Sequence, residues 1–486
     1  MDVGSSGVKA ILLAPARGIV ASATRSVSLY SERIGWAEAD AEEWWASLCS
    51  LVPELLALAG ARKEDVRAVA VSGMVPAVLV TDEDGNPLRR AILQNDARAV
   101  EEIRELREEL AGTDLLGRTG SVLSQQSVAP TLRWLARHEA PVWAAARVVQ
   151  GSYDWLARRL GAMVHVEENW ALESGLFSLQ GEQLDEVWAC LPESVPQIGP
   201  VRRPGDVVGS LSLDAARATG LAPGTPIVVG GADHVLSAYG AGLVETGDCL
   251  VKLGGAGDIL AVADTPLVDA RLYLDKHPLA GAWLPNGCMA TSGSLLRWEQ
   301  SLLGGVSLEE LDAEAAHSAP GALLALPYFL GEKTPLHDPD LRGGVLGLHL
   351  ASTRADLHRA FLESIAYGFR AHVDVFAERG LHVRRTWVTN GGSRSRLWRE
   401  ILADVLQLEL ISLIEHPGAS FGAAVLAGVG VGLIADPSYV EGALARAELI
   451  TPNEARRALY EERYAQFREL SAVTTSLSHA LARSNE

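Results

Sequence analysis

The sequence predicts an α/β protein built from two related halves. Strand and helix signals alternate along all 486 residues, and no low-complexity linker interrupts them. A glycine and serine turn over residues 4–7 leads into an apolar segment at 8–13. A second glycine turn, over residues 254–257, lies between the apolar runs 249–253 and 259–262. One such turn near the start of each half indicates two similar domains.

The domain boundary is expected near residues 242–247, where a helix ends in glycine and a Glu-Thr-Gly-Asp turn follows. We therefore assign the two domains to residues 1–243 and 244–486.

The elements that carry the motifs can be placed in chain order. Asp40 and Glu43 have the spacing of a capping box and predict a helix after residue 40. Apolar residues recur on one face of residues 395–406, which predicts an amphipathic helix. Further expectations are strands at 69–71, 77–80 and 226–229, a turn at 82–87, a helix from 234 and a buried helix of small residues within 421–435.

Composition favours a large cytoplasmic enzyme. Hydrophobic residues make up 48% and charged residues 21% of the chain, as in ordinary globular proteins. The formal net charge of −19 repels nucleic acid and anionic lipid, so neither is an expected partner. The four cysteines lack metal-ligand spacing and indicate reduced thiols. No signal peptide pattern or membrane-spanning apolar stretch is visible.

Several common catalytic motifs are absent from the sequence. There is no Gly-Lys dipeptide and hence no Walker A loop, and no GxGxxG follows a strand. The GxSxG and HExxH patterns are missing too. The class left after these exclusions is enzymes that bind phosphate through other glycine turns.

The first glycine turn has the groups that such an enzyme needs. Its N–H groups, with the hydroxyls of Ser5 and Ser6, can cradle a phosphate. Asp2 before it can hold hydrated Mg²⁺, and Lys9 after it can offset negative charge. An ordinary hairpin turn would explain the same residues. A second turn at Gly254 fits one phosphate chain held between two domains.

Asp233 is the candidate general base. It lies where a buried strand passes into a helix, above the carboxyl end of the strand, where α/β sites form. A helix N-cap explains the same position, and taken in isolation this turn favours the N-cap, although both roles can be partly true. The helix dipole favours an ionised carboxylate there, as a base acting on a sugar hydroxyl requires. The paired glycines Gly391 and Gly392 let a flat ring approach the backbone, although an ordinary strand-to-helix turn also explains them.

The collinear order of these segments resembles the FGGY carbohydrate kinases, and among them most the xylulokinases. The resemblance covers nearly the whole chain. It is carried by Asp2–Lys9, Asp96 with Arg98, Gly231–His234, the Gly254 turn and Gly391–Asp404, and also by residues 35–40, 331–335, 342–343 and 421–424.

The resemblance implies two actin-like, ribonuclease-H-like domains with a closing cleft between them. The sugar would bind mainly to the first domain and ATP, with Mg²⁺, mainly to the second. Asp233 would be the catalytic base and Asp2 would lie near the metal. The nucleotide would be bound by Gly4, Ser5, Ser6, Lys9, Gly254, Gly255, Gly293, Gly391 and Gly392. The sugar would be bound by Met74, Val75, Pro76, Asp96, Trp170 and His234.

Four departures from the family pattern stand out. Only Met1 precedes Asp2, so a short first strand is expected. Gly255 stands where the family usually has threonine, which removes one hydroxyl contact. Val75-Pro76 replaces the Met-His pair of xylulokinases and the Arg-Glu pair of glycerol kinases, and Gln94 replaces a tryptophan. One end of the substrate is therefore expected to be recognised differently.

The expected activity is transfer of the γ-phosphoryl group of ATP to a hydroxyl of a ketopentose, as in the xylulokinases. Such a transfer depends mainly on alignment and charge stabilisation, which glycine turns, an aspartate, a lysine and Mg²⁺ can provide. Two alternatives stay open. The acceptor can be glycerol, erythritol, a ribulose or a heptulose, or the chain can be an actin-like nucleotide-binding protein with no acceptor. A homodimer is left open as well.

Overall fold

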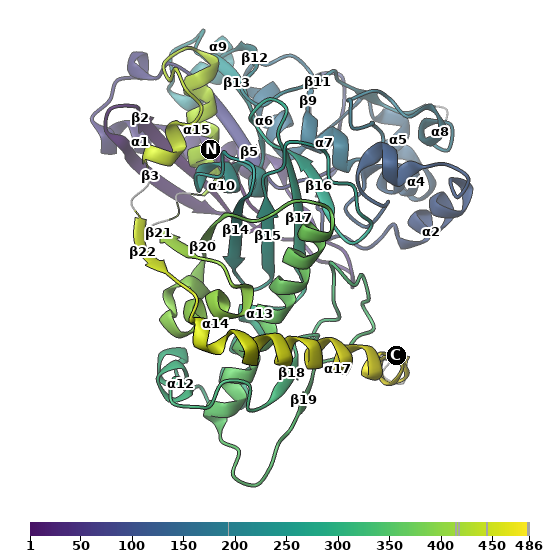
Figure 1. The fold of residues 1–486 in the computed structure, drawn as a ribbon. Coiled ribbons are helices and arrows are strands. Elements are labelled where there is room, and N and C mark those ends of the chain that lie inside the picture. Colours follow the sequence, from purple (N-terminus) through teal and green to yellow (C-terminus); the bar gives the residue numbers. More distant parts are fainter. Residues whose placement is uncertain (193, 414–415, 417, 444–445, 484–486) are drawn as a thin grey trace.

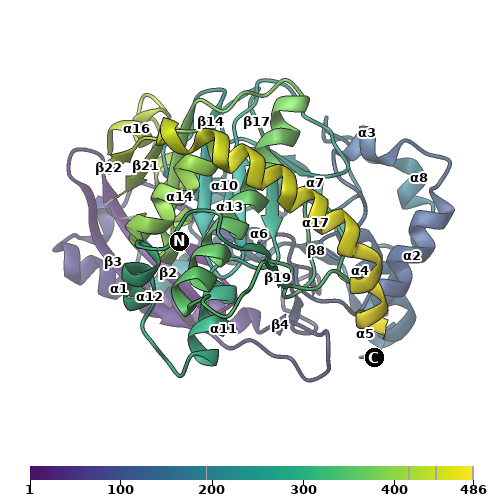
Figure 2. The same cartoon turned by 60° about the horizontal axis from the view of Figure 1, so that its bottom comes forward.

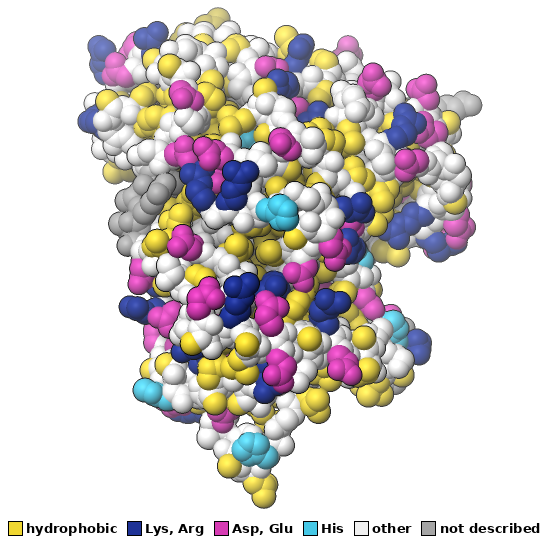
Figure 3. Space-filling model, in the orientation of Figure 1, with side chains coloured by type: hydrophobic (Ala, Val, Ile, Leu, Met, Phe, Trp, Pro, Cys, Tyr) yellow, Lys and Arg dark blue, Asp and Glu magenta, His cyan; other side chains and the backbone are white. Residues whose placement is uncertain are grey.

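The computed structural model describes residues 1–192, 194–413, 416, 418–443 and 446–483. The chain forms two lobes, each built around a mixed β-sheet (Figure 1). The surface is drawn in at the waist between the lobes, and acidic and basic side chains are interspersed over the face seen in Figure 3. Among the described residues, no helix combines the length and the apolar character that crossing a bilayer demands.

The first sheet has six strands in the order β12-β13-β5-β1-β2-β3. Strand β1 runs antiparallel to β2 and parallel to β5, and β5 runs parallel to β13. As expected, the first strand is very short. The strands are β1 (Asp2–Val3), β2 (Gly7–Ala14), β3 (Gly18–Ser26), β5 (Val69–Gly73), β12 (Val207–Ser210) and β13 (Pro226–Ala232).

The second sheet has seven strands in the order β16-β17-β15-β14-β20-β21-β22. Strand β14 runs antiparallel to β15 and parallel to β20, and β20 runs parallel to β21. The strands are β14 (Asp248–Leu253), β15 (Gly257–Ala261), β16 (Tyr273–Lys276), β17 (Trp283–Met289), β20 (Arg385–Thr389), β21 (Leu410–Leu413) and β22 (Arg446–Ile450).

The two sheets repeat one plan, which confirms the repeat predicted from the glycine turns. Strands β1, β2, β3, β5 and β13 have the same order and relative directions as β14, β15, β17, β20 and β21. The turns at residues 4–6 and 254–256 connect the first two strands of each set.

Two helices tie the halves together at the junction of the lobes. Helix α10 (Asp233–Gly240) follows β13, and α15 (Ala419–Gly430) follows β21. Gly422 lets them touch, because a Cβ there would lie 2.3 Å from the carbonyl oxygen of Leu236. Apolar residues of α15 pack with Ile11 and Val228 of the first sheet, so a helix from the second half completes the core of the first. The predicted buried helix of small residues is thus confirmed.

Other helices cover the outer faces of the sheets. Helix α1 (Ala41–Ala59) packs on β2 and β3, and Asp40 caps it by accepting a hydrogen bond from the N–H of Glu42. Helices α13 (Arg354–Glu378) and α14 (Arg396–Leu406) pack beside the second sheet, and α17 (Arg457–Arg483) crosses their outer side (Figure 2). The predicted amphipathic helix is α14.

The remaining elements form smaller layers around this frame. In the first half they are β4 (Glu38–Ala39), β6 (Leu79–Thr81), β7 (Ala91–Ile92), α2 (Val100–Glu109), α3 (Leu115–Thr119), α4 (Val128–His138), α5 (Ala140–Ala145), β8 (Val148–Gln150), α6 (Ser152–Leu160), β9 (Val166–Glu167), α7 (Glu168–Glu173), α8 (Asp185–Trp188), β10 (Gln197–Ile198), β11 (Val201–Arg202) and α9 (Leu213–Thr219). In the second half they are α11 (Gly293–Leu302), α12 (Leu308–Ala315), β18 (Leu324–Leu326), β19 (Gly344–Leu346) and α16 (Tyr439–Ala443). Short 3₁₀ helices lie at 63–65 in the first half and at 391–394 and 454–456 in the second.

Candidate active site

Two cavities meet beside Asp233. The larger cavity, of about 1020 Å³, extends from Asp2 across β20, β21 and α15. The smaller cavity, of about 270 Å³, lies between the side layer of the first half and strands β15 to β17. Asp233, His234 and Lys252 line both cavities. A group bound in one cavity can therefore meet a group bound in the other at these three residues.

The strand-to-helix turn that holds Asp233 requires its two glycines. The β13–β5 register shifts between Val229 and Gly231, and a Cβ on Gly230 would lie 1.9 Å from the carbonyl oxygen of Val71. Gly231 has φ +153°, which side chains rarely tolerate. Ala232 occupies the N-cap position, so Asp233 is not the N-cap that the alternative interpretation required.

The carboxylate of Asp233 is held at the start of α10 and reaches the cavities. Its Oδ1 accepts a hydrogen bond of 2.6 Å from the N–H of His234, and 38% of its side chain is exposed. It lies at the N-terminus of α10, where the backbone N–H groups point toward it. A carboxylate that a bound hydroxyl can reach can act as a general base.

Asp2 provides a second carboxylate on the wall of the larger cavity. Its Oδ1 accepts a hydrogen bond of 2.9 Å from the hydroxyl of Ser72. Burial, together with the negative charge of Asp233, raises the pKa of Asp2 to about 6. Two carboxylates that repel each other beside a cavity fit a hard cation such as Mg²⁺, which prefers oxygen ligands and would relieve the repulsion.

Lys252 is a functional candidate that sequence reasoning missed. It projects from strand β14, where it interrupts the apolar run 249–253, and its Nζ lies 3.2 Å from Asp258 on β15. Burial opposes its charge, but Asp258 and Asp233 raise the pKa of Lys252 overall, so the ammonium persists. Burial also opposes the charge of Asp258, but Lys252 lowers the pKa of that carboxyl. A lone lysine in a buried strand was the available signal.

Polar groups from both halves line the smaller cavity. His234 Nε2 lies 2.7 Å from Asp275 Oδ2, and the amide of Asn286 donates a 2.7 Å hydrogen bond to the same oxygen. Glu173 lies beside them, with ligand atoms of Glu173, His234 and Asp275 within 4.8 Å of one another. Burial alone would lower the pKa of His234, but Asp275, Asp233 and Glu173 raise it well above its usual value. Apart from His234, sequence reasoning did not identify these residues.

The segment around Val75 contributes one wall of the smaller cavity. Val75 and Gln94 both line it. Met74 and Pro76 are not among its lining residues, and the buried Met74 instead accepts a hydrogen bond through its carbonyl oxygen from the Ser152 hydroxyl. Of this expected trio, only Val75 reaches the cavity. As expected from its side chain, it offers no hydrogen bond there.

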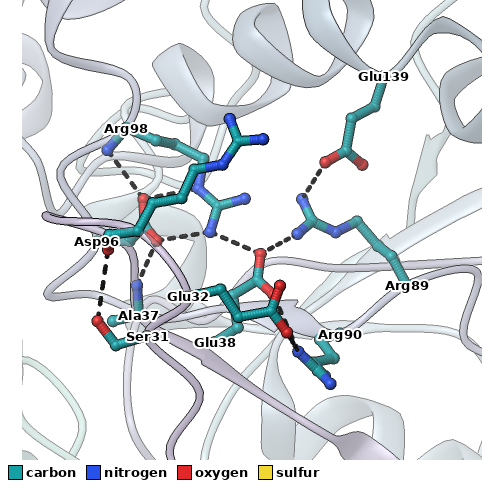
Figure 4. Close-up of polar contacts among 10 residues, drawn as sticks. Ser31, Glu32, Ala37, Glu38, Arg89, Arg90, Asp96, Arg98 and Glu139 are labelled. Carbon is teal, nitrogen blue, oxygen red and sulfur yellow. Dashed lines mark hydrogen bonds and ion pairs between the residues drawn. The ribbon is translucent and has the colours of Figure 1, made fainter.

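Asp96 lies in a buried ion network instead of on a cavity wall (Figure 4). Its carboxylate accepts four hydrogen bonds, one from Ala37 N and three from the backbone and guanidinium of Arg98. Arg98 also pairs with Glu38 at 2.6 Å and lies 3.7 Å from the ring of Trp36. These donors occupy the carboxylate, and Asp96 is not among the lining residues of either cavity, so the sugar contact expected of it has no support in the structure and stays a prediction. The network instead fixes the loop that presents Gln94.

Trp170 likewise does not reach the smaller cavity. Its side chain is fully buried, and its indole N–H donates a 2.9 Å hydrogen bond to the carbonyl oxygen of Ala77. It lines neither cavity. Trp170 lies on α7 three residues before Glu173, and Glu173 does line the smaller cavity.

The first glycine turn is closed by a 2.9 Å hydrogen bond from Gly4 N to the carbonyl oxygen of Gly7. Ser5 and Ser6 are exposed at its tip, and Lys9 is paired across the strands with Asp2. Asp2 alone of this motif lines the larger cavity.

The second glycine turn is anchored to the start of α11. The N–H of Gly293 donates a 2.8 Å hydrogen bond to the carbonyl oxygen of Gly254, and that of Ser292 donates one of 2.9 Å to Gly255. A Cβ on Gly255 would lie 2.9 Å from a guanidinium nitrogen of Arg297. This guanidinium therefore lies close to where the family's usual threonine would project.

The two glycines after β20 have different surroundings. Gly391 lines the larger cavity with Asn390 and Arg394. Gly392 does not, because it packs against Trp398, whose ring a Cβ would approach to 2.3 Å. The close approach of a flat ring to Gly392 is thus real, but the ring belongs to the protein.

Comparisons with known proteins agree with this arrangement. Residues 1–240 match the N-terminal domain, and residues 257–431 the C-terminal domain, of the FGGY family of carbohydrate kinases. The chain is 30% identical to the xylulose kinase of Klebsiella pneumoniae, with 95% of each covered. It is 28% identical to the L-xylulose/3-keto-L-gulonate kinase of Escherichia coli K12, covering 97% of this chain and 96% of that protein.

A solved structure shows the same fold over the whole chain. The crystal structure of xylulose kinase from Rhodospirillum rubrum has 39% sequence identity and a TM-score of 0.92, and the match covers 98% of this chain and 99% of that one. The chain therefore belongs to the FGGY family of carbohydrate kinases, and its activity is ATP-dependent phosphorylation of a sugar.

Proposed function

We propose that the protein transfers the γ-phosphoryl group of ATP to a hydroxyl of a ketopentose of the xylulose type. The observation that carries this proposal is the meeting of a large and a small cavity at Asp233 and Lys252. The larger cavity suits a nucleotide, and the smaller cavity suits a five-carbon sugar. The relatives whose names specify xylulose support the choice of acceptor.

In this proposal Asp233 is the general base. It accepts the proton of the attacking hydroxyl while the oxygen approaches the γ-phosphorus. Lys252, which stays charged beside it, stabilises negative charge that shifts during the transfer. Asp2, with Asp233 nearby, would hold Mg²⁺, which supplies charge neutralisation on the phosphates. Asn390, Gly391 and Arg394 would bind the nucleotide on the far side of the larger cavity.

We also infer a division into domains at residues 243 and 244. The turn between α10 and β14 lies there, and each sheet takes all its strands from its own side of it. Helix α15 crosses over to pack on the first sheet, and α7 of the first half packs against β16 of the second sheet. Motion of the halves would therefore have to involve these contacts and that of α10 with α15. The cytoplasm is the proposed location, since all four cysteines are free thiols.

The test is a coupled ADP-release assay over ketoses and polyols with ATP and Mg²⁺, followed by Asp233→Ala with the best acceptor. The variant should keep its fold and nucleotide binding and lose roughly 10²–10⁴-fold in kcat, the usual contribution of a general base. Asp214→Ala, which removes a carboxylate that is 92% exposed on α9, is the matched control and should retain full activity. Near-normal turnover by a folded Asp233→Ala enzyme would reject the assignment.

A further inference from the structure

The acidic wall of the smaller cavity, formed by Glu173 and Asp275, has no part in the proposed phosphoryl transfer. Asp275 comes from β16 in the second half, and Glu173 is the last residue of α7 in the first. Both line the cavity, together with Asn286 from β17. The imidazole of His234 lies between Asp233 and Asp275, with Nδ1 3.6 Å from Asp233 Oδ1 and Nε2 2.7 Å from Asp275 Oδ2. The wall therefore faces the part of an acceptor that does not react.

Both residues of the acidic wall present an acceptor atom without a partner. Glu173 Oε1 and Asp275 Oδ1 are buried, and the structure gives neither a hydrogen bond. The other oxygen of Asp275 is already used by His234 and Asn286. Buried polar atoms are normally hydrogen-bonded, so each of these oxygens calls for a donor from the ligand. A sugar hydroxyl can donate to such an oxygen, whereas a carboxylate cannot.

The charged residues around the cavity also favour a neutral acceptor. Among the described residues that line it, the cations are Lys252 and His234. Lys252 is 3.2 Å from Asp258, and His234 is 2.7 Å from Asp275, so each already has a carboxylate partner. The lining also contains Asp233 and Glu173. Burial and the nearby Asp275 raise the pKa of Glu173 well above its usual value, so this wall disfavours further negative charge. An anionic acceptor would add such a charge, and the two cations of the lining already have carboxylate partners.

We propose that Glu173 and Asp275 form a specificity wall that accepts hydrogen bonds from hydroxyls on the non-reacting end of the sugar and admits neutral ketoses in preference to sugar acids. The proposal rests on the proposed function, because it takes the smaller cavity as the acceptor site. It also explains how the substrate is oriented although Val75 provides no hydrogen bond. One relative is named for both a neutral ketose and a sugar acid, L-xylulose and 3-keto-L-gulonate, so acceptors of both kinds occur in names among the relatives.

The first experiment compares Glu173→Ala, Glu173→Gln and the control Glu168→Gln. Glu168 is on the same helix α7, pairs with Lys276 at 3.4 Å and lines neither cavity. With D-xylulose, Glu173→Ala should raise KM for the sugar by roughly 5- to 100-fold, as expected for an unpaired hydroxyl. KM for ATP should not change. Glu173→Gln keeps an acceptor oxygen, so its KM for D-xylulose should lie close to the wild-type value.

Monodeoxy analogues of D-xylulose separate recognition from a structural defect. Wild type should discriminate against the analogue that lacks the hydroxyl facing Glu173, and Glu173→Ala should lose that discrimination. An equal loss on every analogue, or a Glu173→Ala enzyme indistinguishable from Glu168→Gln, would overturn the proposal.

The second experiment compares D-xylulose and D-ribulose with D-gluconate. Wild type should have a kcat/KM for D-gluconate at least roughly 100-fold lower, as like-charge repulsion predicts. Asp275→Asn should reduce the ratio of kcat/KM for the ketoses to kcat/KM for D-gluconate by roughly tenfold or more. Efficient phosphorylation of D-gluconate by wild type would overturn the specificity wall and leave the kinase function intact. No ADP release with any sugar would instead overturn the proposed function and the wall with it.

Discussion

Replacing Asp96 with alanine should destabilise the first half strongly, and the structure gives the size of the effect. The side chains of Asp96 and Arg98 are 2% and 1% exposed, so their pair is shielded from water. The substitution removes all four hydrogen bonds that the carboxylate accepts. Arg98 Nη1 already lacks a partner, and Glu38 would be left as the sole carboxylate beside the guanidinium. Breaking a buried pair in this way costs about 3–5 kcal/mol.

Arg104→Ala is the matched control. Arg104 also pairs with two carboxylates, Glu101 and Glu108, but all three side chains are more than half exposed. Pairs of this kind contribute about 0.2–1 kcal/mol, because water and salt screen them and long side chains lose entropy. A count of ion pairs would predict similar effects for the two substitutions. Burial predicts a large difference.

Urea unfolding and hydrogen exchange measure the two variants. Asp96→Ala should lower the unfolding midpoint and speed exchange of residues 35–39, where the N–H of Ala37 loses its acceptor. It should also raise KM for the sugar, because Gln94 lies in the same loop and lines the smaller cavity. Equal, small shifts for Asp96→Ala and Arg104→Ala, with unchanged exchange at residues 35–39, would refute the reasoning.

Three further predictions follow from other parts of the structure. Burial raises the pKa of Glu332 to about 7, above its value of 4.5 in the unfolded chain. The buried carboxyl therefore destabilises the folded protein increasingly as pH rises from 4.5 to 7, and this destabilisation persists at higher pH. In urea unfolding, the free energy of unfolding of Glu332→Gln relative to wild type should therefore rise by roughly 3 kcal/mol between pH 4 and pH 8. A difference that does not depend on pH would contradict this. Gly422→Ala should lower the free energy of unfolding by about 1–3 kcal/mol, because its methyl would meet the carbonyl oxygen of Leu236. Gly442→Ala, whose methyl would have no atom of the described residues within 4 Å, should not destabilise the protein, and equal melting temperatures for the two variants would argue against the close contact. Because both halves line the smaller cavity, bound sugar should tighten the binding of a nonhydrolysable ATP analogue by about 1–3 kcal/mol. Calorimetry with and without D-xylulose measures this coupling, and identical affinities would favour a preformed site.

Local patterns in the sequence were enough to predict the frame of the molecule. The two glycine turns, the strand-to-helix turn at Asp233 and the amphipathic helix α14 were all recognised correctly. Each depends on backbone geometry or side-chain periodicity over a few neighbouring residues, which the sequence displays directly. The repeated pair of turns also indicated the repeated sheet, because each turn connects the first two strands of its half.

Residue type and order could not decide which polar side chains reach the cavities. Asp96 and Asp233 are both aspartates in motifs that resemble the family, yet one is enclosed by Arg98 and the other lines both cavities. Trp170 and Gly392 fit a binding site by position, but packing against protein atoms buries the tryptophan and fills the space beside the glycine.

The smaller cavity is decided by the tertiary structure alone. Glu173 and Asp275 are about a hundred residues apart in the chain, on a short helix and an edge strand of different halves, and neither carries a local motif. They meet because the second sheet packs against α7, and only that packing removes water and leaves their oxygens without partners. The sequence by itself thus determined the fold class, the repeat and the strand-to-helix turn at Asp233, which arise from short-range backbone geometry. The substrate-facing wall required the long-range packing that sets burial and the pairing of charges.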